Sequence, residues 1–598
     1  MSKQKLIPCT GESRLRNAWL VIGCFLVTAG IAGLLLSDIS YELVRSLLDK
    51  LSLDGNADTY LLHMHEAFCA RLSNIGILYL VLGIFFVVLS KPATREFESA
   101  NPIPTQPQET GSRAFGLDRS LLGWATLAVC IFAITYRVFL LDEPLQYDEA
   151  FTFVNFSSQS VVNVLSNYSV PNNHIFHSLL VFFSYHVFGN FEWAIRLPAL
   201  VSGSLVIFAG FLVATRLFGR IAGYLATILC ATAPTLVLYS ADARGYTLYV
   251  LCFLALIWIA LDIIEEDRPV SWMLLAIVSA IGAWTIPSFS YCLFSVFVWI
   301  VYVHLKKDRR YYGIYLKVLV IGLLATTLVV ILYSPVLIRF SIGSIVEQHN
   351  AVAFDRIKTM EWAQFFRLNL NETSRLWASW HQGFFVGTSI IFPCLALLAM
   401  MPVHSCSQYK RHLLPCLVLG SIVFLLFQRN APFSRTWLFL QPIYFAYVAA
   451  GMAIILNRVR FGIRESHLAF VFGFLILTGS FYTSWTAVQG HYGLRHPFYD
   501  ANTVGNFLSN NLTESDRIAV LDPPRPTLEY YLYRNNMKLN DYLFERASSD
   551  SVSNIYIATT SWMGESLDEV KQHFEIREFS NTKLIHESAY SKVYKISE

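Results

Sequence analysis

Long apolar runs, each about as long as a membrane-crossing helix, alternate with short polar stretches along most of the chain. Residues 18–37 and 73–90, for example, contain no charged side chain. Because crossing the bilayer core takes about 20 mostly apolar residues, run length predicts about thirteen spans. These lie near residues 17–37, 73–90, 119–140, 196–217, 219–239, 246–264, 270–286, 288–305, 315–337, 384–402, 411–427, 434–456 and 466–487.

Basic residues orient the predicted spans, because Lys and Arg concentrate on the cytoplasmic side of membrane proteins. They cluster in alternate loops, which is consistent with thirteen spans and a cytoplasmic N-terminus. The first apolar run has no clear cleavage site and is interpreted as a retained anchor. The other face then holds residues 38–72, 141–195, 240–245, 338–383, 428–433 and everything after about 490.

Four regions follow from this pattern. Residues 1–90 form a two-helix membrane extension, and the proline-containing residues 91–118 form a cytoplasmic linker. Residues 119–489 form the transmembrane core, and residues 490–598 form a small extracytoplasmic domain. In that last domain short apolar runs at 517–521, 554–558 and 592–596 alternate with helical stretches at 527–534 and 566–574, which predicts an α/β fold.

Composition supports an integral, multi-pass membrane protein. Of the 598 residues, 55% are hydrophobic and 15% charged, and the mean hydropathy is +0.47. A soluble domain has about 25% charged residues. The net charge of +3 comes without a basic, aromatic-rich soluble stripe, which argues against a nucleic-acid partner. The ten cysteines are scattered and form no CxxC pair, so they indicate apolar packing and no metal site.

Two adjacent carboxylates, Asp148 and Glu149, open the first long outer loop directly after a predicted span. An acceptor hydroxyl that attacks a sugar carbon needs a base, and an ionised carboxylate near the membrane surface can supply it. The same two residues could also be solvated loop acids or could cap the next helix. Chemistry alone does not decide between these roles.

Three further motifs follow the acidic pair in order. They are a histidine segment around His174 and His177, an Arg-Leu-Pro sequence that starts at Arg196, and an Ala-Arg-Gly-Tyr sequence that contains Arg244 and Tyr246. In this order and spacing the chain resembles the bacterial membrane glycosyltransferases related to protein O-mannosyltransferases and to the lipid A aminoarabinose transferase, within the GT-C superfamily. The match is close over about residues 120–265 and looser to about 490.

The resemblance implies an all-α GT-C core of about eleven helices. The two N-terminal helices and the C-terminal α/β domain are added to that core. It implies an inverting glycosyltransferase that moves one sugar from a polyprenyl-phosphate donor to a lipid, glycan or protein acceptor. Membrane lipids are the other expected partners. The membrane would be the bacterial inner membrane, with the active site facing the periplasm.

The resemblance also assigns roles to residues. Asp148 is the expected general base, with Glu149 as its catalytic neighbour. The donor phosphate and sugar are expected to contact the side chains named in the three motifs, joined by Arg435 near the outer end of a later span: His174, His177, Arg196, Arg244, Tyr246 and Arg435. Each arginine could instead snorkel toward lipid headgroups, and His174 could cap a helix.

Cofactor chemistry is the least specified part of the prediction. His174 and His177 share a helix face, and only Glu149 offers an obvious third ligand, so no metal cofactor is predicted, although a divalent ion stays open. Two departures bear on substrate identity. Asn172-Asn173-His174-Ile175 replaces the family's usual His-Pro-Pro, and two spans precede the core.

Three other functions compete with the transferase. The first is a transporter, but transporters often show paired halves and ionisable groups inside their spans, and neither is apparent here. The second is a ligase that moves a whole lipid-linked glycan. The third is a non-catalytic membrane scaffold.

Overall fold

The computed structural model describes most of the chain. The described residues are 10–51, 62–89, 121–307, 313–340, 361–401, 408–458, 465–496, 498–537, 539–544, 553–560, 564–576 and 581–597. The predicted linker, 91–118, lies outside the described residues.

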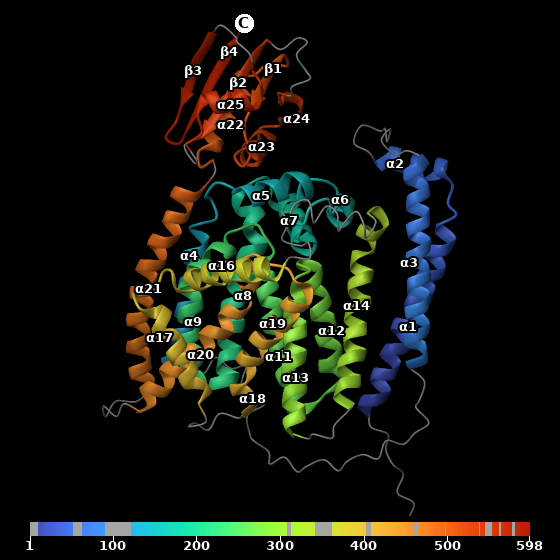
Figure 1. The fold of residues 1–598 in the computed structure, drawn as a ribbon, viewed down its shortest axis with the longest axis vertical. Helices are drawn as coiled ribbons and strands as arrows, with labels where there is room; N and C mark the ends of the chain where they lie inside the picture. The colour runs from blue at the N-terminus through green and yellow to red at the C-terminus, as the bar shows by residue number, and fades with distance from the viewer. Residues whose placement is uncertain are drawn as a thin grey trace, which may run out of the picture.

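A bundle of apolar helices makes up most of the molecule (Figure 1). Eight described helices are long and apolar enough to cross a membrane: α3 (Leu62–Leu89), α4 (Leu121–Val138), α8 (Glu192–Phe218), α11 (Tyr246–Glu266), α13 (Phe289–Lys307), α14 (Gly313–Arg339), α20 (Leu440–Arg458) and α21 (Glu465–Arg495). The pair α9 (Arg220–Thr232) and α10 (Pro234–Ser240) is also apolar enough when taken together, and its axes differ by 64°, as in a broken span or a re-entrant loop.

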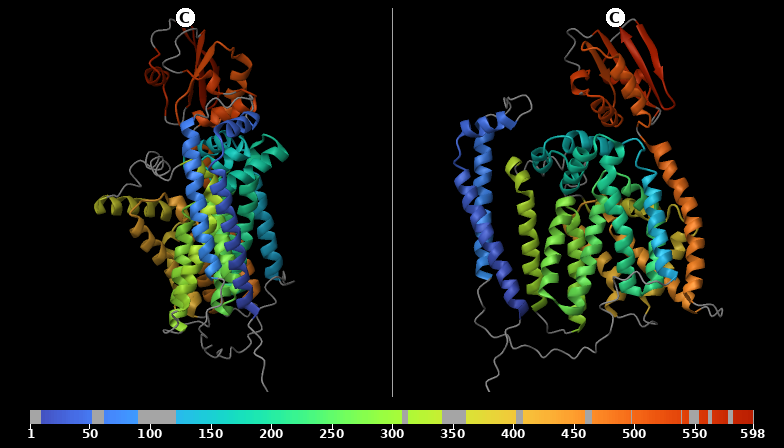
Figure 2. Two further views of the ribbon diagram at one scale, coloured as in Figure 1. Left: turned by 90° about the vertical axis from the view of Figure 1, so that its right-hand side faces the viewer. Right: turned by 180° about the vertical axis from the view of Figure 1, so that it is seen from behind.

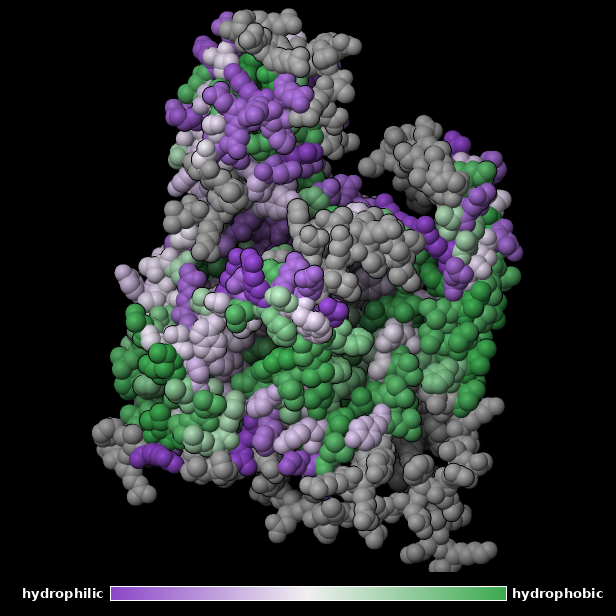
Figure 3. All heavy atoms as spheres, in the orientation of Figure 1, coloured by the Kyte–Doolittle hydropathy of each residue, from purple (hydrophilic) through white to green (hydrophobic). Residues whose placement is uncertain are grey.

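The four remaining predicted spans coincide with α1 (Thr10–Leu36), α12 (Pro269–Thr285), α17 (Thr388–Met400) and α19 (Leu413–Gln428), whose apolar parts are shorter. Every predicted span is therefore helical, and the one at 219–239 consists of two helices. On the face that Figure 3 shows, hydrophobic side chains gather in a broad belt across the helix bundle, as expected of helices that cross a bilayer core.

The N-terminal helices α1 and α3 form a tight antiparallel pair at one edge of the bundle, joined through α2 (Tyr41–Leu51) (Figure 2). Glycines let the two backbones touch. A Cβ atom on Gly30 would lie 2.7 Å from the carbonyl oxygen of Gly76, and one on Gly83 would lie 2.9 Å from that of Gly23. Small residues at helix contacts allow this approach in membranes.

A layer of short helices covers the end of the bundle nearest the C-terminal region, which the sequence analysis predicts to be the outer end and which is called the outer end below (Figure 1). It contains α5 (Tyr147–Thr152), the π-helical turn η1 (Phe153–Ser157), α6 (Val161–Ser166) and α7 (Ile175–Phe188). All four belong to the first long outer loop. From the predicted second outer loop, the amphipathic helix α16 (Trp362–His381) lies across the bundle below this layer in the view of Figure 1, against the 3₁₀ turn η2 (Ser434–Trp437) and α10. The four-residue helix α18 (Gln408–Arg411) lies at the opposite end of the bundle.

The C-terminal region forms a small α/β domain above this layer (Figure 1). Its four strands are β1 (Asp516–Ala519), β2 (Asn554–Thr560), β3 (Asn581–Glu587) and β4 (Ser591–Ser597). They run in the order β1-β2-β4-β3, with β1 and β2 parallel and the other pairs antiparallel. The helices are α22 (Ala501–Asn511), α23 (Arg525–Arg534), α24 (Leu539–Tyr542) and α25 (Leu567–His573). The predicted α/β character is confirmed.

The domain packs directly on the outer layer. Phe153 of η1 meets the rings of Tyr530 and Tyr533 edge-on, with centroids 5.5 and 6.1 Å apart. Arg534 at the end of α23 pairs with Glu192 at the start of α8, at 2.7 Å. Helix α23 also contacts α5, so the domain supports the segment that carries the predicted base.

Candidate active site

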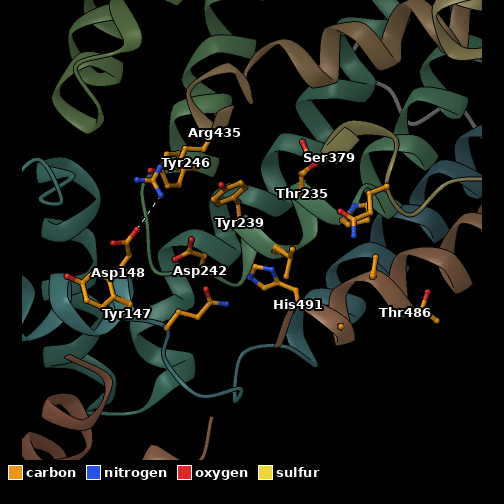
Figure 4. A pocket seen from close by; sticks show the side chains of 16 residues that line it. Tyr147, Asp148, Thr235, Tyr239, Asp242, Tyr246, Ser379, Arg435, Thr486 and His491 are labelled. Atoms are coloured by element: carbon orange, nitrogen blue, oxygen red, sulfur yellow. Dashed lines mark hydrogen bonds and ion pairs between the residues drawn. The ribbon is translucent and has the colours of Figure 1, made fainter. Parts of the chain in front are cut away.

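A cavity of about 640 Å³ opens at the outer end of the bundle (Figure 4). It lies where α5, α10, the start of α11, α16, η2 and α21 come together. Its lining residues are Gln146, Tyr147, Asp148, Pro234, Thr235, Leu238, Tyr239, Asp242, Tyr246, Ser379, Gln382, Arg435, Thr486, Ala487, Gly490 and His491. Of the predicted site residues, Asp148, Tyr246 and Arg435 line this cavity.

Helix α5 turns its two acids in opposite directions. A capping box starts the helix, and the backbone N–H of Gln146 donates to Oε2 of Glu149 at 2.9 Å. Glu149 is 1% exposed, whereas the Asp148 side chain is 32% exposed and faces the cavity (Figure 4). The adjacent acids therefore occupy different environments.

Asp148 is surrounded by groups that favour its charged form. Asn172 donates to Oδ1 at 3.1 Å, and Arg244 lies 3.8 Å from the same oxygen. Arg435 lies 3.4 Å from Oδ2. Burial raises the pKa of Asp148, but Arg244, Arg435 and Asn172 outweigh it and hold the pKa below its usual value. The carboxylate is therefore ionised at neutral pH.

Arg435 and Tyr246 lie beside Asp148 on the same side of the cavity (Figure 4). The Arg435 guanidinium lies 5.8 Å from the Tyr246 ring centroid and 4.7 Å from that of Phe433, so two aromatic faces hold it. Its side chain is 34% exposed. Such a partly open guanidinium can accept a bidentate anion such as a phosphate.

Glu149 and Arg196 form a buried ion pair behind the cavity. The guanidinium donates to both carboxylate oxygens, at 2.8 and 2.7 Å, and Arg196 is 0% exposed. The backbone N–H of Ala243 donates to the same carboxylate at 2.7 Å. Arg196 also donates to the carbonyls of Leu141 and Glu143 in the chain before α5. This pair ties α5, α8 and the α10–α11 turn together, and neither member lines the cavity.

His174 and Arg244 form a second buried layer. The backbone N–H of Gly245 donates to His174 Nδ1 at 2.9 Å, and Nε2 lies 3.4 Å from Arg244. Burial, then Arg244 and His177, hold the pKa of His174 well below its usual value, so the ring is neutral. Arg244 donates to Thr152 Oγ1 at 3.1 Å. The structure places these side chains beneath α5, outside the cavity lining.

His177 is buried one helical turn further along α7, and both ring nitrogens lack a hydrogen-bond partner among the described residues. It does not line the cavity. Across those same residues, no group of three or more His, Cys, Asp or Glu side chains could hold a metal ion.

Asp242 is a cavity residue that the sequence analysis did not single out. It lies in the α10–α11 turn, two residues before Arg244. Burial raises its pKa well above the usual value, and the nearby Glu149 and Asp148 add to the rise despite Arg244. Its buried Oδ1 has no partner among the described residues. The sequence feature that could have identified Asp242 is its position as an acid just before the motif that contains Arg244 and Tyr246.

Comparison with known structures is decisive for the fold. The structure matches ArnT from Cupriavidus metallidurans bound to undecaprenyl phosphate with a TM-score of 0.55 at 14% identity, over 80% of this chain and 98% of that one. Apo ArnT matches with a TM-score of 0.53 at 14% identity, over 79% and 98%. The chain has the GT-C fold of membrane glycosyltransferases.

Two other comparisons concern the sequence of the chain. Residues 172–338 match the family model described as dolichyl-phosphate-mannose-protein mannosyltransferase. That region runs from the turn before α7 to the end of α14 and includes Arg196, Asp242, Arg244 and Tyr246. No curated protein matches the sequence significantly.

Proposed function

We propose that this protein is an inverting glycosyltransferase that moves one sugar from a polyprenyl-phosphate donor to an acceptor on the outer side of the membrane. One observation carries the proposal. An ionised, partly exposed carboxylate, Asp148, faces a cavity beside a partly exposed guanidinium, Arg435, in a GT-C fold. The undecaprenyl phosphate bound to ArnT from Cupriavidus metallidurans supports a polyprenyl donor.

Arg435 receives the donor phosphate in this mechanism. In the free protein it lies 3.4 Å from Asp148, with about a third of each side chain exposed. A phosphate oxygen competes with the Asp148 carboxylate for the same guanidinium, because an arginine fork binds phosphate bidentately. Donor binding therefore draws Arg435 away and raises the basicity of Asp148 when the substrate is in place.

Asp148 then takes the proton of the acceptor hydroxyl as its oxygen attacks the anomeric carbon. The new glycosidic C–O bond forms as the bond from that carbon to the phosphate oxygen breaks. The bonding electron pair leaves with the phosphate, so the products are an inverted glycoside and polyprenyl monophosphate. Arg435 offsets the charge that develops on the leaving group.

Asp242 supplies a neutral hydrogen-bond donor on the same wall. Its raised pKa keeps it protonated while Asp148, with its lowered pKa, is ionised. Two carboxyl groups whose environments push their pKa values apart can perform two different tasks. A sugar hydroxyl in the cavity can accept the proton of Asp242.

The buried residues position this machinery. The Glu149–Arg196 pair fixes α5 against the α10–α11 turn, and Arg244 with His174 supports α5 from below. In this proposal these buried residues hold Asp148 and Tyr246 in position and do not contact the substrate themselves. No step of the mechanism uses a metal ion. The acceptor is a lipid, glycan or protein presented at the periplasmic face of a bacterial inner membrane.

The decisive experiment measures sugar release in lipid-reconstituted protein, with a panel of polyprenyl-phosphate sugars and an acceptor extract. Asp148→Asn should abolish release from the productive donor, because an amide cannot take the proton. The matched control is Asp142→Asn, an exposed acid six residues earlier that does not line the cavity, and it should behave as wild type. Near-normal release by folded Asp148→Asn protein contradicts the assignment.

A different outcome would favour another reaction. If wild type releases no single sugar from any donor, but joins a whole lipid-linked glycan to an acceptor in the extract, the protein is a glycan ligase.

A further inference from the structure

One buried arginine in the membrane-spanning bundle has no role in the mechanism above. Arg137 lies near the end of α4 and is 0% exposed. Among the described residues Arg137 forms no ion pair, and it donates only to uncharged groups: the Ser240 hydroxyl and the carbonyls of Ala133, Cys230 and Ala231. A charged side chain is costly inside a membrane protein and marks a function by default.

Two of the contacts reach the last turn of α9. Arg137 Nη1 donates to the carbonyl of Ala231 at 3.1 Å, and Nη2 donates to that of Cys230 at 3.3 Å. In a continuous α-helix these carbonyls would accept from residues 235 and 234. Residue 234 is proline, which has no N–H, and the axis bends by 64° at this point. Arg137 therefore occupies the two acceptors at the helix break.

A third contact ties down the other side of the break. Arg137 Nε donates to Ser240 Oγ at 3.0 Å, and that hydroxyl donates to the carbonyl of Leu236 at 2.5 Å. Ser240 is the last residue of α10 and is held against α8, because a Cβ atom on Gly203 would clash with its side chain. One planar guanidinium thus bridges the end of α9 and the end of α10.

The short helix fixed in this way forms one side of the cavity. Pro234, Thr235, Leu238 and Tyr239 of α10 line it, followed by Asp242 in the next turn. We propose that Arg137 is a positioning residue that sets the direction of α10 and thereby the place of Tyr239 and Asp242. Arg137 itself does not line the cavity, so it acts through the bend. This inference rests on the proposed transferase function for its kinetic readout.

Arg137→Met should fold but lose about 10²-fold in kcat/KM, mostly in kcat, because displacing catalytic groups by about 1 Å costs that much. Arg137→Lys should recover part of the loss, since an ammonium can reach some of the carbonyls but cannot span both helices. Ser240→Ala cuts only the link to α10 and should give a smaller loss.

The matched control is Arg216→Met at the other end of the bundle, where Arg216 pairs with Asp262 and Glu265 at 2.6 Å. It should lower thermal stability and leave kcat/KM of the folded protein unchanged.

The double variant Arg137→Met with Pro234→Ala separates position from stability. Alanine at position 234 has a backbone N–H that can donate to the carbonyl of Cys230. Helices α9 and α10 can then run as one straight helix, and thermal stability should recover. Activity should stay low, because a straight helix removes Tyr239 and Asp242 from the site. Recovery of activity together with stability would overturn the proposal, as would wild-type kcat/KM in folded Arg137→Met or Ser240→Ala protein.

A readout without turnover separates this proposal from the transferase function. Thr235→Cys places a thiol in the cavity wall, and its labelling by a water-soluble reagent can be followed by mass spectrometry of that peptide. Labelling should fall when Arg137→Met is added and should not change with Arg216→Met. An unchanged rate with Arg137→Met contradicts the positioning role. If Arg137→Met lowers the labelling rate but the wild-type protein transfers no sugar, the positioning role of Arg137 stands and only the proposed transferase function is refuted.

Discussion

At the scale of single residues, the two acids of the cavity should give opposite pH dependence. Burial, Glu149 and Asp148 raise the pKa of Asp242 well above its usual value. As pH rises through that raised value, the group ionises, stops donating a hydrogen bond and repels the Asp148 carboxylate. We expect kcat/KM to fall on the alkaline side.

Asp242→Asn should keep neutral-pH activity and lose this alkaline fall, since an amide is a donor that does not titrate in this range. The measurement is the pH profile of kcat/KM for both proteins. The same alkaline fall in the variant would show that another group titrates there. Loss of activity at neutral pH would show that Asp242 acts as a carboxyl group.

The Glu149–Arg196 pair makes a prediction about stability. Both side chains are buried, so removing one partner leaves an uncompensated charge and costs about 3–5 kcal/mol. Glu149→Gln and Arg196→Met should each lower the thermal midpoint strongly. The double variant should lose less than the sum of the two, because neither charge is left alone. Additive losses in a thermal-shift assay would contradict the ion-pair account.

The same residues show how far sequence analysis reaches into the site. The family resemblance pointed to eight side chains, of which Asp148, Tyr246 and Arg435 line the cavity. It could not tell that Glu149 points inward, because adjacent helix residues differ by about 100° in direction and the sequence does not show which faces the core. The site roles themselves stay predictions.

At the scale of elements, the length of the apolar runs predicted where the long helices lie. It did not predict the break in one of them or the exposed strand β3. Each of the thirteen predicted spans falls on helical residues, but the run at 219–239 is two helices, and only eight described helices are long and apolar enough to cross a membrane by themselves. The break at Pro234 was missed, because the run continues through it at full hydrophobicity. Strand β3 was missed because its side chains are mostly exposed and form no apolar run.

The close packing of α1 against α3 through glycines can be tested separately from the rest of the bundle. In Gly76→Leu the side chain has no room, since a Cβ atom alone would lie 2.9 Å from the Gly30 carbonyl oxygen. The two helices must separate, and the variant should show a lower thermal midpoint. Transfer activity of the folded protein should be unchanged, because α1 and α3 do not line the cavity. Reduced kcat/KM would instead give the N-terminal helices a part in the reaction.

At the scale of the whole molecule, the C-terminal domain and the membrane bundle meet at the helix that holds the base. Phe153 follows α5 directly and packs against Tyr185 of α7 and against Tyr530 and Tyr533 of α23. The position of Asp148 thus depends on contacts from both parts. The C-terminal domain therefore contributes to catalysis by holding Asp148 in place, although none of its own residues takes part in the reaction.

Loosening that junction should therefore lower activity while both parts stay folded. Phe153→Ala removes a ring that is 1% exposed, and core Phe→Ala changes cost about 3–5 kcal/mol. We expect lower kcat and faster backbone hydrogen exchange in α5, with unchanged exchange in β2 and β4 of the sheet. The control Leu584→Ala lies on exposed β3, where the side chain is 41% exposed, and should change neither quantity. Normal kcat in Phe153→Ala protein with fast exchange in α5 would mean that Asp148 is held by the Glu149–Arg196 pair alone, and the domain would then serve another purpose, such as acceptor binding.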